Sequence, residues 1–198
     1  SLSTAISAAT INDGLRGALA ALPGVAAAEV LENDTGAADV NGLPAHSIAC
    51  IVQGGDSTQI AKTIALRKTQ GTYTHGTTAV TVYGESGISS TIRYFPPTPV
   101  TIRVAVTVNA LPGYSSGVAD AIKAAVSAYI SALPFGEDIL YTRLFGPALL
   151  MGTTDAAKFH IAGLQSAKGS AALGTADIVL AFNEQPQCLT TDVTVSVV

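Results

Sequence analysis

The chain has 198 residues, enough for one sizeable domain or two small ones. Its net charge is −4 and it carries no basic patch, so a nucleic-acid partner has no electrostatic support. Hydrophobic residues reach 48%, yet no apolar run approaches the roughly 20 residues of a membrane-spanning helix, so we expect no membrane insertion. Charged residues make up only 12%, which predicts a weakly charged surface that is easily desolvated and suits burial in an assembly. The alternative is an ordinary monomer with a bland surface.

The residues that most often carry chemistry are few and scattered. Cys50 and Cys188 lie far apart among apolar neighbours, so we expect two buried thiols and neither a disulfide nor a metal site. The histidines, His46, His75 and His160, are not spaced for zinc. No secretory signal is visible, so we expect the protein to be made in the cytoplasm and not to be secreted by a signal peptide.

The chain begins with a predicted helix that Thr10 or a nearby serine caps and that Pro23 and Gly24 end. Its apolar face consists of Ile11, Leu15, Ala18, Leu19 and Leu22. Residues 25–32 then have the composition of a strand, and residues 33–42 form a polar turn region.

The stretch from residue 41 to residue 71 is the best defined part of the first half. Gly42 and Pro44 predict a turn, and residues 47–52 form a short apolar run typical of a buried strand. Gly54 and Gly55 then break the strand. Asp56 stands at the N-cap of a following helix, with Gln59 at the spacing of a capping box. The apolar stripe of this helix is Ile60, Ala61, Ile64 and Ala65, and Gly71 is its expected stop.

Two alternating runs, residues 77–83 and 88–95, predict an antiparallel hairpin around a turn at residues 84–87. Three prolines follow within residues 96–99, which no central strand or helix interior accommodates. We therefore place a domain boundary there, between residues 1–96 and residues 97–198.

The second half opens with a regular alternation over residues 100–109, which predicts a half-buried strand. The next helix, over residues 118–133, follows the i, i+3, i+4, i+7 rule throughout. Its other face carries small residues where charge is usual, and a second element or a subunit could approach closely there. The positions that we consider a possible interface are Ala124, Ser127, Ala128 and Ser131. Simple helix propensity of alanine explains the same composition equally well.

The remaining residues predict a short helix over 139–150, strands over 158–164, 177–182 and 192–198, and a polar loop over 166–174. The whole pattern indicates an α+β protein of two small halves, with mainly antiparallel strands and packed amphipathic helices.

No catalytic constellation stands out, so we expect no enzyme activity, no catalytic or metal-binding residues and no cofactor. The sharpest alternative is a small-molecule or phosphate-binding enzyme domain that uses the Gly54–Gly55 corner and His46. Against it, the corner lacks the lysine of a P-loop, and Asp56 would repel an anion. His46 and Ser47 are adjacent on an extended segment, so their side chains point apart. A surface-binding or adhesin-like module with threonine-rich strands is a third hypothesis.

The chain also resembles a known family along most of its length. Similar residues are Glu32 to Thr35, Asp39, Gly42 to Ile48, Gly54 to Asp56, Ile60, Ala61, Ile64, Lys68, Gly71 and Gly76. In these positions the chain resembles the baseplate J-like family, whose members are wedge subunits of contractile phage tails and related injection machines. Members are usually longer, so the resemblance corresponds to their C-terminal portion. An Asn-Glu pair at Asn183 and Glu184 is also similar to one in that family, where its role would be structural.

The resemblance implies a structural subunit of a virion tail baseplate that acts in wedge assembly. It would contact other baseplate or wedge subunits, and possibly itself, without chemistry of its own. The motif residues with an implied structural role are Asn33, Gly42, Pro44, Gly54, Gly55, Asp56 and Gly71.

Overall fold

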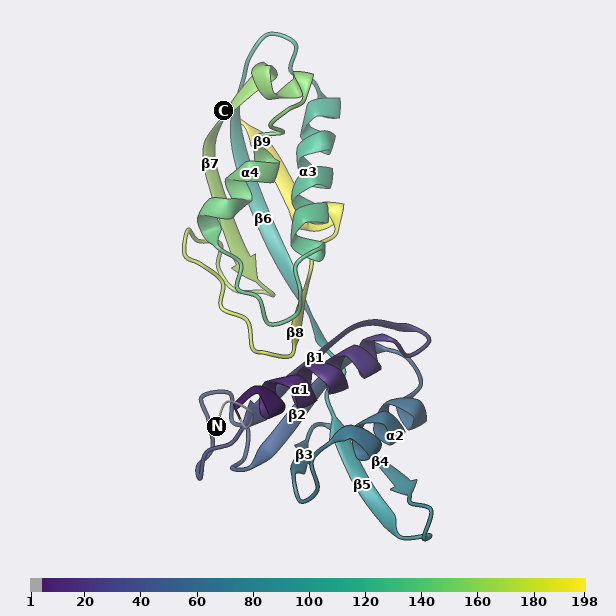
Figure 1. Cartoon of the computed structure of the whole chain (residues 1–198). Helices are drawn as coiled ribbons and strands as arrows, with labels where there is room; N and C mark the ends of the chain where they lie inside the picture. The colour runs from purple at the N-terminus through teal and green to yellow at the C-terminus, as the bar shows by residue number, and fades with distance from the viewer. Residues whose placement is uncertain (1–4) are drawn as a thin grey trace. The chain divides into compact units, whose positions relative to one another are not determined.

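A computed structural model describes residues 5–198 of the chain, which divide between Pro97 and Thr98 into two compact units (Figure 1). The division lies one residue from the boundary that the prolines indicate. Within these residues nine strands form small mixed sheets and four α-helices accompany them, so the expected α+β fold is confirmed. We call the two parts unit 1 and unit 2 and describe each by itself.

Unit 1 places two helices against a three-stranded sheet and a hairpin. Its elements are α1 (Ala5–Ala20), β1 (Val25–Asn33), β2 (Ser47–Gly54), α2 (Ser57–Arg67), β3 (Tyr73–His75), β4 (Thr78–Tyr83) and β5 (Ser89–Tyr94). β2 is the central strand, antiparallel to β1 and parallel to β3. β4 and β5 form the expected hairpin, and Phe95 continues it onto β2 through hydrogen bonds with Cys50 and Val52.

The core of unit 1 lies between α1, α2, β2 and the hairpin. The first six residues of β2 are all buried, as expected of a short apolar run. α1 begins at Ala5, so the prediction that Thr10 caps this helix is wrong, and Thr10 lies inside it. The alanines and serines before Thr10 do not break a helix, and the buried anchors Leu15 and Leu19 lie further along it.

The sequence predicted the start of α2 correctly but not its end. Asp56 is the N-cap, and its carboxylate accepts a hydrogen bond from the Gln59 amide at 2.9 Å. The helix ends at Arg67, so the prediction of Gly71 as its stop is wrong. The backbone of Lys68 is already extended, and its ammonium group donates to the Thr72 carbonyl at 3.0 Å. Gly71, at φ +82°, instead forms the turn into β3.

Unit 2 is a sheet with helices over one face (Figure 1). Its regular elements are β6 (Thr98–Ala110), α3 (Ser116–Ser131), α4 (Phe145–Ala148), β7 (Phe159–Lys168), β8 (Glu184–Gln187) and β9 (Val193–Val197). Three short 3₁₀ turns accompany them, η1 (Tyr141–Leu144), η2 (Thr154–Lys158) and η3 (Thr190–Asp192). β6 is the central strand: β7 pairs with one edge, and β8 and then β9 pair with the other.

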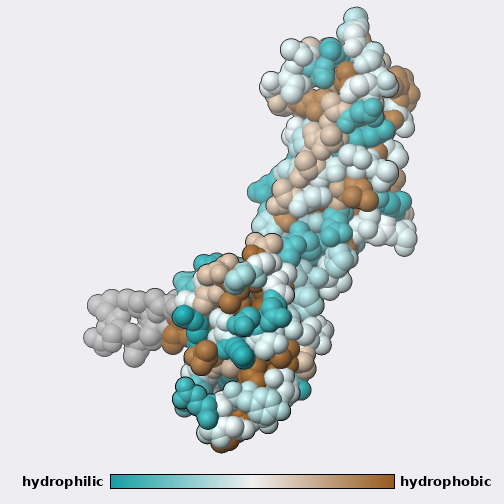
Figure 2. All heavy atoms as spheres, turned by 90° about the vertical axis from the view of Figure 1, so that its right-hand side faces the viewer, coloured by the Kyte–Doolittle hydropathy of each residue, from teal (hydrophilic) through white to brown (hydrophobic). Residues whose placement is uncertain are grey.

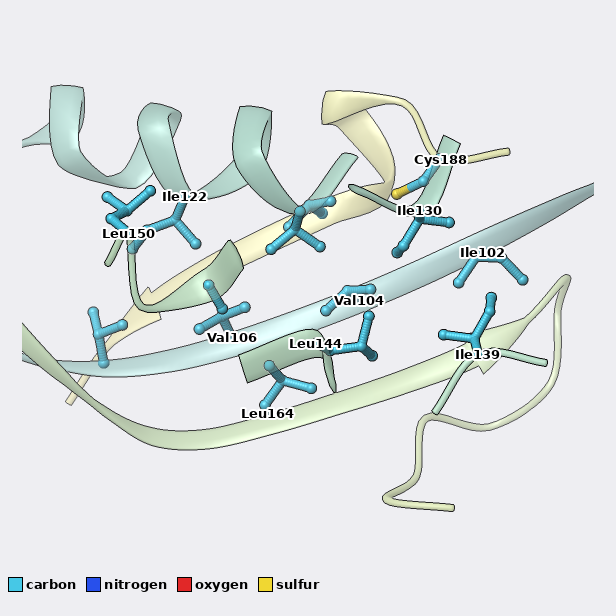
Figure 3. Packing of buried hydrophobic residues seen from close by; sticks show 14 of the residues in the cluster. Ile102, Val104, Val106, Ile122, Ile130, Ile139, Leu144, Leu150, Leu164 and Cys188 are labelled. Carbon is cyan, nitrogen blue, oxygen red and sulfur yellow. The ribbon is translucent and has the colours of Figure 1, made fainter. Parts of the chain in front are cut away.

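The alternation along β6 is realised in full, because Ile102, Val104, Val106 and Val108 are all buried while the residues between them are not. These side chains pack against the buried stripe of α3, which includes Ile122 and Ile130 (Figure 3). Leu144 and Leu164 close the core from the side of α4 and β7.

Three expectations for the end of the chain need correction. Residues 177–182 are not a strand, because aspartate side chains take the place of a neighbouring strand as hydrogen-bond acceptors. Asp138 accepts from the Leu180 amide, and Asp177 accepts from the Tyr141 amide. A single bridge joins Ile139 to Ile178. β7 continues to Lys168, into the expected loop, because the long β6 offers a partner that far. The helix expected over 139–150 is only η1 followed by the four residues of α4.

The strands pair mainly antiparallel by the number of paired residues, as expected, but half of the strand pairs are parallel. β1–β2, β4–β5 and β6–β7 are antiparallel, whereas β2–β3, β6–β8 and β6–β9 are parallel. The parallel pairs join segments that a helix or a long connection separates in the sequence, and local alternation carries no information about such pairing.

Candidate functional site

Asn33, the last residue of β1, organises the loop that carries the first part of the family-like motif. Its side chain is buried, with an exposed fraction of 3%. The amide nitrogen lies 2.7 Å from the Ala37 carbonyl, 2.8 Å from the Leu43 carbonyl and 3.1 Å from the Pro44 carbonyl. The amide oxygen accepts hydrogen bonds from the amide and the hydroxyl of Thr35, at 3.0 and 2.7 Å. One side chain therefore ties both ends of the loop together.

Asp39 completes the frame from within the loop. Its carboxylate accepts hydrogen bonds from the amides of Asn41 and Leu43, at 2.9 and 2.8 Å. Gly42 has φ +76°, a left-handed conformation that this tight turn requires and that favours glycine. Leu43 is completely buried, whereas the neighbouring Val40 is completely exposed. The motif thus builds a fixed loop that presents Val40 to the outside.

A shallow hollow of about 330 Å³ lies beside this loop. It is lined by Glu32, Asn33, Asp34, His46, Gln70, Gly71 and Thr72. The His46 side chain is exposed, and its backbone is in the left-handed region at φ 52°. Ser47 is buried and its hydroxyl donates to the Pro44 carbonyl at 2.6 Å, so its hydrogen bond serves the loop and not the imidazole.

The Gly54–Gly55 corner has a structural explanation. Both residues have positive φ, +77° and +82°. A Cβ atom at Gly54 would lie 2.4 Å from the Gly24 carbonyl oxygen, and one at Gly55 would lie 2.6 Å from a methyl group of Val25. Glycine is required here because the chain that enters β1 lies directly against the end of β2, where Val25 pairs with Gly54.

The corner is also remote from His46, because they stand at opposite ends of β2. Eight residues of extended chain span roughly 25 Å. The two features of the hypothesised enzyme site are therefore not brought together by the fold.

An exposed apolar groove of about 420 Å³ runs between α2 and the tip of the β4–β5 hairpin, and we call it the α2 groove. Its apolar side chains are Leu66, Tyr83 and Ile88, with exposed fractions of 85%, 73% and 73%. Lys62, Lys68 and Glu85 also line it. The face of unit 1 that carries α2 shows apolar patches interspersed with hydrophilic ones (Figure 2). Exposed apolar side chains gathered beside charged ones are typical of a contact surface.

The small-residue face of α3 is partly used within unit 2. The hydroxyls of Ser127 and Ser131 donate to the Cys188 carbonyl, at 2.5 and 3.1 Å, and the Cys188 amide donates to Ser131 at 3.1 Å. Two of the four expected interface residues therefore hold the segment that follows β8. Ala124 and Ala128 remain exposed.

Neither cysteine is suited to nucleophilic chemistry. Cys50 is buried in unit 1 and Cys188 in unit 2, and both are free thiols. Burial raises the pKa of each thiol to about 12, so neither forms the reactive thiolate near neutral pH. Within residues 5–198 no group of three or more His, Cys, Asp or Glu side chains is arranged to hold a metal ion.

Glu184 has a structural role at the start of β8. Its carboxylate lies 2.6 Å from the Lys168 ammonium and accepts from the Ala181 amide at 2.8 Å. Burial alone would raise the pKa of Glu184, but these hydrogen bonds and the positive charge of Lys168 outweigh it and lower the pKa. Its amide also closes a turn with the Ala181 carbonyl, in keeping with the turn that the sequence indicates, although Glu184 belongs to a strand as well.

No family model matches this chain, and the search of curated proteins found no matching relative. Among the helices of the described residues, none combines the length and the apolar character needed to cross a membrane.

The α2 groove is the feature that inspection of the sequence missed. Leu66 follows the buried stripe of α2 but lies outside it, and Tyr83 is out of phase with the inward-facing Val80 and Val82. The sequence therefore showed that Leu66 and Tyr83 are apolar residues at positions expected to face solvent. That they converge on one surface depends on how the hairpin packs on α2.

Proposed function

We propose that this protein is a structural subunit of the baseplate of a contractile phage tail or a phage-like injection device. In this role it acts in wedge assembly through contacts with other baseplate subunits or with further copies of itself. The observation that carries the proposal is the α2 groove, an exposed apolar surface in a chain that has few charges.

The motif shared with the baseplate J-like family supports the proposal in a second way. The side chains of Asn33 and Asp39 bond to loop carbonyls and amides, and Gly54 and Gly55 permit the close approach of the chain that enters β1. These residues build a shape and leave no reactive group aimed at a substrate. Residues that fix the conformation of a loop and of a strand corner suit a structural subunit.

The size and chemistry of the α2 groove suit a protein partner. Leu66, Tyr83 and Ile88 offer apolar area that is favourable to bury, at about 25 cal/mol per Å². Lys62 and Glu85 supply charges of both signs along the groove. An aromatic and aliphatic centre beside polar side chains matches the usual anatomy of a subunit contact.

Cross-linking of intact tail particles, followed by mass spectrometry, tests the proposal. Particles come from the cell that carries this gene, and an amine-reactive cross-linker is used. We expect cross-links from Lys62 and Lys68 to other tail proteins, because both lysines line the α2 groove. Particles that lack this chain altogether would contradict the proposal.

A matched pair of variants then tests the groove itself. Leu66→Ser removes an apolar side chain from the α2 groove, whereas Val179→Ser makes the same kind of change at an exposed position, 70% accessible, in unit 2. We expect the Leu66 variant to reduce incorporation into particles about tenfold or more, equivalent to at least 1.4 kcal/mol. The Val179 variant should be incorporated normally. Equal incorporation of both variants would show that the groove is not the contact.

A further inference from the structure

β9 leaves one of its edges open, and this edge is the strongest unexplained feature of unit 2. In the described part of the chain, β9 pairs with β6 and with no other strand. An open edge presents main-chain donors and acceptors that another extended segment can pair with. Natural proteins usually protect such an edge with charges, prolines or bulges. β9 has the sequence Val-Thr-Val-Ser-Val and contains none of these.

The pairing identifies which groups face outward. The amide of Val198 donates to the carbonyl of Val108 on β6. Main-chain groups alternate between the two edges of a strand, so Thr194 and Ser196 also direct theirs toward β6. Val193, Val195 and Val197 consequently direct theirs toward the open edge. The Val193 amide is already bonded to the Thr190 carbonyl, which leaves its carbonyl and both groups of Val195 and Val197 for a partner.

A second, independent observation is a hollow of about 540 Å³ beside this edge. It is lined by Asp120, Lys123, Thr190, Thr191, Val193, Thr194 and Val195. α3 packs along β9 and supplies one wall, while β9 and η3 supply the other (Figure 1). The hollow therefore lies along the open edge of β9 and beside α3. This is the place that an added strand would occupy.

The lining of this groove restricts the chemistry of its occupant. Lys123 and Asp120 form an ion pair at 3.5 Å, so their charges largely offset each other. The other lining groups are threonine hydroxyls and valine side chains. An uncharged segment with small apolar or hydroxyl side chains fits such a lining, whereas a charged one would be desolvated without a partner.

We propose that the groove between α3 and β9 binds an extended segment of another polypeptide, which adds to the sheet of unit 2 as a strand beside β9. The segment has about five residues and supplies main-chain hydrogen bonds to Val193, Val195 and Val197. Antiparallel pairing with a second copy of β9 fits less well, because it would bring the second α3 to the same face of the sheet, beside the groove. The proposal concerns unit 2 and does not depend on the function proposed above.

Selection from a displayed library of random peptides of about seven residues, with the whole chain as target, tests this inference. The decisive variant is Val195→Pro, which removes an amide from the open edge but none from the pairing with β6. We expect enriched peptides that bind the wild-type chain and lose about tenfold or more in affinity for this variant. A Ser196→Ala variant, which changes a side chain outside the groove lining and no outward amide, should keep most of the affinity.

Amide hydrogen exchange provides a readout that does not require the proline variant to fold. In the free chain the amides of Val195 and Val197 should exchange fast, and those of Thr194 and Ser196 slowly. Bound peptide should slow the first pair and leave the second unchanged. Failure to enrich any peptide, or protection without this alternation, would overturn the proposal.

Discussion

Replacing Asn33 by alanine is the most direct test of how the motif loop is held. The substitution removes an amide nitrogen that lies within 3.1 Å of three carbonyl oxygens, and an oxygen that accepts two hydrogen bonds from Thr35. Each buried group left without a partner costs about 1–3 kcal/mol. The loop lies at the surface, so water can reach some of these groups once it relaxes. We therefore expect a loss of about 2–4 kcal/mol in the free energy of unfolding of unit 1.

The measurement must distinguish the two units, because they can unfold in separate transitions. Amide NMR signals followed through a urea titration do so. We expect the signals of residues 11–97 to lose their native positions at lower urea in Asn33→Ala, and the signals of unit 2 to stay where they are. Asn41→Ala is the matched control, since Asn41 is exposed and contributes its main-chain amide to the loop. It should change stability by less than about 0.5 kcal/mol.

Asn33→Asp adds a test of the same geometry through pH. The introduced carboxylate would face carbonyl oxygens in place of the amide donor, so the variant should be at least as unstable as Asn33→Ala at pH 7. Protonation restores a donor, and the surrounding carbonyl oxygens favour the protonated form in the folded state, so the deficit relative to wild type should shrink as the pH falls from 7 toward about 4. A loss under about 0.5 kcal/mol in both variants would refute the view that Asn33 holds the loop.

Three further changes test other parts of the structure. Gly54→Ala should destabilise unit 1 by at least about 2 kcal/mol in urea unfolding, because the new Cβ atom would lie 2.4 Å from a carbonyl oxygen and the backbone φ is +77°. Gly14→Ala is the control: Gly14 lies in a helix with no atom near its Cβ position, and this change should stabilise unit 1 by about 0.5–1 kcal/mol. The thiols of Cys50 and Cys188 should resist alkylation at pH 8 until urea unfolds the chain. Folding raises the pKa of both thiols from 9.0 to about 12. The stability that the protonated thiols contribute is therefore fully present below pH 9 and is lost as the pH rises toward 12. Folding lowers the pKa of Glu184, so its ionised carboxylate stabilises unit 2 above pH 4.5, the ordinary pKa of the group, and this contribution is lost in acid. Glu184→Gln should therefore flatten the fall in unit 2 stability as the pH drops below 4.5. An unchanged acid profile would mean that its contact with the lysine contributes nothing measurable.

Some features of the candidate surfaces could be anticipated, and others could not. Asp56 as a helix cap follows from a spacing of three residues, and the buried alternation along β6 follows from a period of two. Leu66 and Tyr83 are visible as apolar residues outside the buried pattern, but the groove between them exists only because the hairpin packs on α2. The open edge of β9 appears only once its partner is known to be β6.

The sequence by itself determined what depends on neighbours within a turn or two: the buried strand β2, the stripe of α3, the cap of α2 and the division near the prolines. These features obey local periods and local hydrogen bonds, which residue order contains directly. The tertiary structure decided which strands pair in parallel, why Gly54 has to lack a side chain, and what Ser127 and Ser131 hold. Each of these depends on a contact between segments tens of residues apart, and the choice among such contacts is made by packing of the whole unit.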